Sequence, residues 1–281
     1  VVVGVMAVVS PHCLSYNALL NTYVTRREPM TTSDTPNGYG GISTEIVQFS
    51  GHNGDSIGGY LARPAGPGPY PGVIVIPEIF GLVDHVRELT FKFAGHGYVA
   101  LAPDLWHREG PGAPEDVSAK VRGDGGVPDD RCIGDCEGAA THLKGLDYCT
   151  GKLGVIGFCS GGRQVVLFSC NTSSLSAAVS CYGGRVVQPE LSERMPKAPI
   201  DMISGLQCPL LNLTGDEDQN PSLEQVERLR QEMETHGKTF ESHSYPEAGH
   251  AFFADYRPSY RQAAAVEGWQ HAFDWFEKYL S

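Results

Sequence analysis

The sequence predicts an α/β protein with a mostly parallel central sheet and helices on both faces. Short β-branched runs such as Val73-Ile-Val-Ile76 are typical of strands buried on both faces. From about residue 42 such runs alternate with segments of helical periodicity. A chain of 281 residues could hold two domains, but α/β folds of roughly 200 to 250 residues are routinely one. We therefore expect a single domain at 42–281 and an N-terminal extension outside the core at 1–41.

The expected strands follow from β-rich runs bounded by turn residues. They are Ile42–Ser50, Ser56–Arg63, Val73–Ile76, Tyr98–Ala102, Lys152–Phe158, Ala177–Tyr182, Pro209–Leu213 and Thr239–Tyr245. The first two flank a His52-Asn-Gly-Asp55 turn, which indicates a hairpin. A Pro/Gly loop then leads into the third.

The expected helices lie between these strands and at the end of the chain. They are Val86–Gly95, Glu137–Cys149, Ser222–His236 and Arg261–Leu280. Residues 105–130 contain several Gly and Pro and have no clean periodicity. This stretch is therefore predicted to form a loop or lid.

The composition narrows the classes of partner and compartment. The formal net charge is −12 and no basic run is present, which argues against nucleic acid and anionic membranes as partners. Eight cysteines in so long a chain are expected to be mostly buried thiols in a reducing compartment. The Cys132–Cys136 pair has no second pair at zinc-site spacing, so no metal is expected.

The N-terminal segment bears on localisation. No stretch approaches the roughly 20 apolar residues that span a bilayer. Val1–Val9 resembles the apolar region of a signal peptide, but no positive segment precedes it. Met30 opens a polar segment and is a candidate alternative start, with residues 1–29 outside the core fold. We expect a cytoplasmic rather than an exported protein.

The main chemical signal is Gly157-Phe-Cys-Ser-Gly-Gly162, which follows a buried-strand pattern and precedes a helical one. It matches the nucleophile elbow G-x-S-x-G with cysteine in the serine position. The sharp turn strains the backbone at the nucleophile, and Gly157 and Gly161 relieve the crowding. The helix N-terminus favours a thiolate at Cys159. The alternative interpretation is a glycine-rich turn with an incidental cysteine.

Candidate partners for this cysteine follow in the chain order of elbow hydrolases, which is nucleophile, acid and histidine. Asp216, Glu217 and Asp218 crowd one loop after a predicted strand, and His250 follows the last one. Open α/β sheets place their sites at the carboxyl ends of strands. The spacing therefore favours His250 as the base and leaves the acid open among the three carboxylates.

Five segments in this order resemble the motifs of the dienelactone hydrolases (carboxymethylenebutenolidases) of the α/β-hydrolase superfamily. They are Pro77-Glu-Ile-Phe-Gly81, Ala102-Pro-Asp-Leu105, Gly157–Gly162, Gly215-x-x-Asp218 and Ala248-Gly-His-Ala-Phe252. The resemblance extends from about residue 42 to the end. It implies a single-domain α/β-hydrolase fold and places the acid at Asp218.

The resemblance also assigns roles around the cysteine. It implies that Glu78 contacts the thiol, which rests protonated and is activated when substrate binds. It further implies that the N–H groups of Ile79 and Ser160 form the oxyanion hole. The expected reaction is hydrolysis of a small carboxylic ester or lactone through a thioester at Cys159, without any cofactor, by a monomer or homodimer.

The substrate side of the resemblance is weaker. The family has an arginine four residues after the histidine, where this chain has Ala254. Replacement charges could come from Arg257, Arg108 or Arg163. The candidate substrate-binding residues are Trp106, Tyr256 and Arg257. Two alternative functions remain, a redox-responsive or non-catalytic protein and an acyltransferase.

Overall fold

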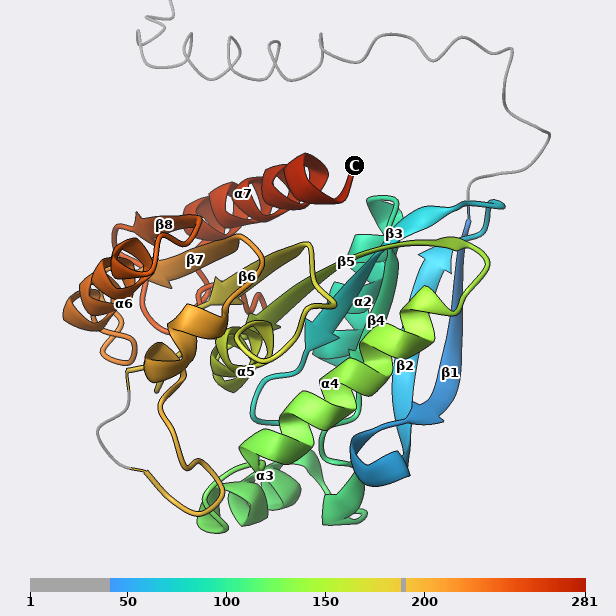
Figure 1. The fold of residues 1–281 in the computed structure, drawn as a ribbon, viewed down its shortest axis with the longest axis horizontal. Helices are drawn as coiled ribbons and strands as arrows, with labels where there is room; N and C mark the ends of the chain where they lie inside the picture. The colour runs from blue at the N-terminus through green and yellow to red at the C-terminus, as the bar shows by residue number, and fades with distance from the viewer. Residues whose placement is uncertain (1–40, 188–190) are drawn as a thin grey trace, which may run out of the picture. The chain divides into compact units, whose positions relative to one another are not determined.

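A computed structural model describes residues 41–187 and 191–281. The predictions about Met30 and residues 1–29 lie outside the described residues. Eight strands form one sheet in the order β1-β2-β4-β3-β5-β6-β7-β8 (Figure 1). Their bounds are β1 Ile42–Ser50, β2 Ser56–Pro64, β3 Tyr70–Ile76, β4 Val99–Pro103, β5 Cys149–Phe158, β6 Ala177–Cys181, β7 Leu210–Gly215 and β8 Phe240–Tyr245.

The sheet is antiparallel only at one end. β1 pairs with β2 as the predicted hairpin, and β2 pairs antiparallel with β4. The pairs from β4 through β3, β5, β6 and β7 to β8 are all parallel. Because parallel strands end at one edge, the loops after β3, β5, β7 and β8 gather the predicted site residues there.

Helices cover both faces of the sheet, as the sequence predicts (Figure 1). Apolar residues of α4 (Asp129–Lys144), α5 (Ser160–Ser169) and α6 (Leu223–Thr235) pack on one face. Apolar residues of α2 (Asp84–Gly95) and α7 (Gln262–Leu280) pack on the other. Strands β3 and β5 lie centrally and are fully buried over Val73–Ile76 and Leu153–Phe158, which explains the apolar runs there. The predicted α/β-hydrolase architecture is confirmed.

Two sequence predictions are wrong between residues 105 and 149. The predicted loop at 105–130 contains the helix α3, Pro114–Gly123, and a short 3₁₀ turn at His107–Glu109. The helix predicted at Glu137–Cys149 begins instead at Asp129 and ends at Lys144. Pro114 in the first turn of α3 and the carboxylates in the first turn of α4 are ordinary helix-start signals. Cys149 opens β5, opposite Tyr70.

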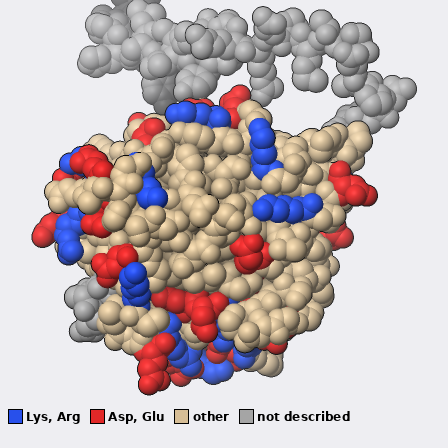
Figure 2. All heavy atoms as spheres, in the orientation of Figure 1, with Lys and Arg blue, Asp and Glu red and all other residues tan. Residues whose placement is uncertain are grey.

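The surface and the helices add two observations. On the face drawn in Figure 2, basic side chains lie next to acidic ones without a continuous basic area. Within the described ranges, no helix is both long and apolar enough to cross a membrane. The absence of a nucleic-acid partner stays a prediction.

Candidate active site

Cys159 lies at a sharp turn between β5 and α5, with φ 56° and ψ −117°. Non-glycine residues rarely adopt this conformation, so the surrounding structure must hold it. The flanking glycines are required by close approach: a Cβ at Gly157 would lie 2.3 Å from the carbonyl oxygen of Gly161. A Cβ at Gly161 would lie 2.6 Å from the carbonyl oxygens of Ile76 and Pro77. The strained turn presents the half-buried Cys159 at the start of α5.

His250 lies next to Cys159 and to one of the three candidate acids. His250 Nδ1 is 2.8 Å from Asp218 Oδ2, and the Cys159 side chain lies near enough to His250 to raise the pKa of the imidazole. Asp218 is 4% exposed and accepts a second hydrogen bond, from the Asn220 N–H, at 2.9 Å. Asp216 instead accepts from the Ser244 hydroxyl. The structure thus brings together the cysteine, histidine and carboxylate that the sequence singles out.

The surroundings of His250 favour its protonated form. Burial lowers the pKa of His250, but hydrogen bonds and charge at Asp218 and Cys159 more than offset this and raise it to about 10. The pKa of His250 thus lies above the ordinary histidine value near 6.5. His250 therefore stays protonated at neutral pH and loses its proton as the pH rises through about 10.

NMR of the imidazole groups tests this assignment. In the wild type we expect the His250 signals to show no titration step between about pH 5.5 and 8.5. Asp218→Asn removes a hydrogen-bonded charge, so the His250 step should move down into that range. The signals would be assigned by their loss in His250→Gln. A wild-type step near the ordinary histidine value would contradict the description of the pair.

Glu78 follows β3 and is 3% exposed. Its Oε2 accepts from Arg257 at 2.8 Å, and its Oε1 accepts from the Tyr182 hydroxyl at 3.4 Å. Burial raises the pKa of Glu78, and the charge of Arg257 opposes that effect. Within the described part of the chain, no hydrogen bond joins Glu78 to Cys159. The contact implied by the family resemblance stays a prediction.

Arg257 and Ala254 explain how this chain departs from the family pattern. Ala254 is fully buried in the apolar layer that includes Phe252 and Phe253, so that position has no room for an arginine. Arg257, three residues further on, reaches Glu78 and stacks over the rings of Phe80 and Tyr256. Its charge is therefore engaged by a buried carboxylate.

Two backbone N–H groups near Cys159 are available as hydrogen-bond donors. Ser160 is the first residue of α5, where a helical N–H has no intrahelical acceptor. The Ile79 N–H has no hydrogen-bond acceptor among the described residues. Ile79, Cys159, Ser160 and His250 line the same cavity. Two free N–H groups beside a nucleophile match the predicted oxyanion hole, which stays a prediction.

The cavity beside Cys159 has a volume of about 460 Å³, the size of a small-molecule site. Of the candidate substrate-binding residues, only Trp106 lines it. Tyr256 and Arg257 line a separate cavity with Phe80 and His85. Tyr256 is 54% exposed. The structure therefore separates Trp106 from the other two candidates.

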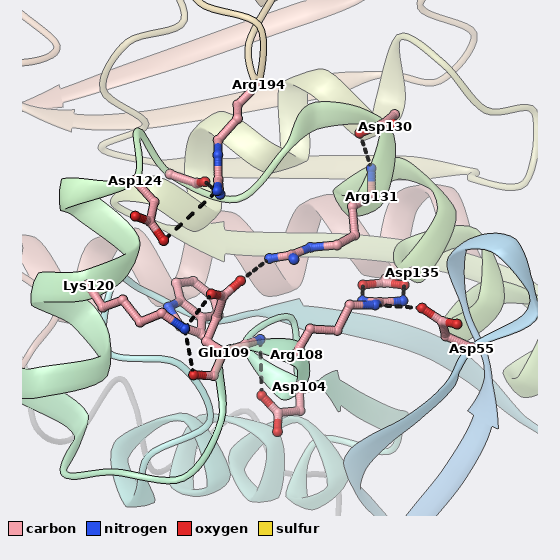
Figure 3. Close-up of polar contacts among 12 residues, drawn as sticks. Asp55, Asp104, Arg108, Glu109, Lys120, Asp124, Asp130, Arg131, Asp135 and Arg194 are labelled. Atoms are coloured by element: carbon pink, nitrogen blue, oxygen red, sulfur yellow. Dashed lines mark hydrogen bonds and ion pairs between the residues drawn. The ribbon is translucent and has the colours of Figure 1, made fainter.

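Ion pairs hold Arg108 and Glu109, which follow the cavity-lining residue Trp106 (Figure 3). Arg108 donates to Asp135, which is fully buried, and to Asp55. Glu109 pairs with Arg131 of α4 and Lys120 of α3. Arg108 is thus committed to structural carboxylates.

Tyr182 is a residue of this site that the sequence did not identify. It follows β6, is fully buried and has φ 40°. Its hydroxyl donates to Glu78, and its ring meets the His250 ring edge-on at a centroid distance of 5.2 Å. A residue directly after a buried parallel strand is a signal that could have found it.

Together the parallel sheet and the strained strand-to-helix turn define an α/β-hydrolase. The model of the dienelactone hydrolase family matches residues 57–280. The chain belongs to that family and is a hydrolase.

Individual relatives agree with this. A Salmonella typhimurium protein named "Putative carboxymethylenebutenolidase" is 38% identical, covering 89% of this chain and 92% of its own. A Methylorubrum extorquens protein of the same name is 38% identical, over 79% and 77% of the two chains. The crystal structure of a Klebsiella pneumoniae protein named "Putative Dienelactone Hydrolase" superposes with a TM-score of 0.77 at 35% identity, covering 85% of this chain and all of the other.

Proposed function

We propose that this protein hydrolyses a small carboxylic ester or lactone, with Cys159 as the nucleophile. The observation that carries the proposal is the geometry at one end of the sheet. There, Cys159 lies at a strained elbow and lines the same cavity as His250, which is paired with a buried Asp218. The relatives named carboxymethylenebutenolidase supply the lactone as the favoured class.

In the first half-reaction the sulfur of Cys159 attacks the carbonyl carbon, and the thiol proton is held by His250. The N–H groups of Ile79 and Ser160 stabilise the oxyanion. The carbon–oxygen bond then breaks, His250 gives its proton to the leaving oxygen, and a thioester remains on Cys159. The raised pKa of His250 suits this step because the group begins it protonated.

In the second half-reaction His250 is neutral and takes a proton from water. The resulting hydroxide attacks the thioester, the carbon–sulfur bond breaks, and the sulfur leaves as a thiolate beside the protonated His250, which restores the starting pair. Asp218 keeps the imidazole in the tautomer that both steps need. Side chains, two backbone N–H groups and water supply every step.

Glu78 would tune the resting thiol. It is a buried carboxylate whose partner Tyr182 packs against the His250 ring, so its negative charge favours protonated His250 and opposes further negative charge at Cys159. Arg257 and Tyr182 each donate to one of its oxygens and hold it in place.

Trapping the acyl-enzyme tests the proposal. A panel of activated esters and lactones, including a dienelactone, is mixed with the protein and quenched in acid. We expect the mass of one acyl group on the peptide that contains Cys159, released by neutral hydroxylamine as a thioester would be. Thioester formation with release of free acid supports hydrolysis.

Other results of the same experiment identify the alternatives. Release only to an added alcohol or amine acceptor would indicate an acyltransferase. If no substrate acylates the protein while Cys159 oxidises readily, the redox-responsive interpretation replaces the proposed one. Acyl groups on a different residue would contradict the assignment of the nucleophile.

A further inference from the structure

One face of α5 borders the cavity that contains Cys159. Ser160, Arg163 and Gln164 are spaced i, i+3 and i+4, which places them on the same side of a helix. All three line the cavity. Much of the remaining wall is apolar and includes Val121, Val127 and Met195.

This helix face contains polar atoms without partners. Ser160 Oγ, Arg163 Nε and Gln164 Oε1 are buried, and none has a hydrogen-bond partner within the described part of the chain. Gln164 is only 6% exposed and Arg163 only 5%. The indole N–H of Trp106, which also lines the cavity, lacks a partner too. Buried polar groups are normally hydrogen-bonded, so a cluster of unsatisfied ones around a cavity indicates a ligand that satisfies them.

The charge of the cluster selects the kind of ligand group. Arg163 is held by Asp129, with its two terminal nitrogens 2.7 and 3.1 Å from the two carboxylate oxygens. Asp129 is 4% exposed, so the pair is buried and its charge is compensated. Ser160 and Gln164 are neutral. A neutral polar face matches a hydroxyl group, which both donates and accepts, better than it matches an anion.

We propose that Gln164 is a specificity-determining residue that hydrogen-bonds a hydroxyl group on the acyl part of the substrate. The inference rests on the proposed function, because attachment to Cys159 places the acyl group in this cavity. Gln164 lies five residues beyond Cys159, about 7.5 Å along the helix axis. The hydroxyl group therefore lies several carbons from the carbonyl that Cys159 attacks.

A matched pair of substrates tests the proposal: 4-nitrophenyl hexanoate and 4-nitrophenyl 6-hydroxyhexanoate. Wild type is expected to show a higher kcat/KM for the hydroxylated ester by about tenfold. Gln164→Leu keeps the volume and removes the hydrogen-bonding groups. It should lower kcat/KM for the hydroxylated ester about tenfold or more and leave the hexanoate unchanged or improved. Gln231→Leu, on the exposed side of α6, is the matched control and should leave the ratio unchanged.

A second measurement separates recognition from chemistry. Calorimetry on Cys159→Ala compares binding of 6-hydroxyhexanoate and hexanoate, with and without Gln164→Leu. Preference for the hydroxy acid that is lost in the Gln164 variant supports the inference. If Cys159-dependent hydrolysis is observed but Gln164→Leu affects both esters equally, the inference is wrong and the proposed function stands. If neither ester acylates Cys159 and neither acid binds preferentially, both are overturned.

Discussion

Cys159→Ala is expected to lower kcat/KM for ester or lactone hydrolysis at least about a thousandfold. The substitution removes the sulfur that forms the thioester and leaves the turn intact, because alanine is smaller than cysteine. The cavity, the free N–H groups and the His250–Asp218 pair would remain, so substrate should still bind. The measurement is steady-state hydrolysis of an activated ester, together with a thermal unfolding curve to show that the fold is retained.

Cys149→Ala is the matched control for this prediction. Cys149 is also half-buried and free, but it lies at the beginning of β5, whereas Cys159 follows the end of that strand. Its replacement should leave kcat/KM unchanged. Turnover that survives in Cys159→Ala at more than a few per cent would assign catalysis to another group. Equal losses in the two variants would indicate a folding defect.

The parts of the structure that the sequence could predict are those set by local pattern. Val73–Ile76 of β3 and Leu153–Phe158 of β5 are apolar because both faces of these strands are buried there. The elbow needs glycine at its flanks because other backbone atoms lie within contact distance. Each of these properties is encoded within a few neighbouring residues. The parallel topology then brings the loops that carry Cys159, Asp218 and His250 to one edge of the sheet.

The parts that could not be predicted depend on partners far apart in the chain. In the sequence Arg108 is one arginine in a predicted loop, and only the fold brings it to the buried Asp135 of α4. Trp106 and Tyr256 are both loop aromatics in the sequence, and only the fold sends them to different cavities. The pairing of Arg257 with Glu78 is likewise a contact across 179 residues. In each case the position of the side chain depends on a tertiary contact that the neighbouring sequence does not encode.

Substitutions at two aspartates on one loop provide the other large expected effect. Asp218→Asn should lower kcat/KM for hydrolysis by about 10³ to 10⁴, because an amide nitrogen facing Nδ1 favours the wrong imidazole tautomer. Asp218 is buried and 2.8 Å from His250, whereas Asp216 is exposed and bonded to Ser244.

Asp216→Asn is therefore the matched control: it makes the same chemical change two residues away and should alter kcat/KM less than about threefold. Steady-state kinetics on the same activated ester would measure both variants.

The pH dependence adds a test that simple loss of stability would not reproduce. Removing the Asp218 charge lowers the pKa of His250 from about 10, so the residual activity of Asp218→Asn should depend on a group that titrates lower than in wild type. A larger loss in Asp216→Asn would move the acid to Asp216. Equal small losses would mean that His250 works without a carboxylate partner.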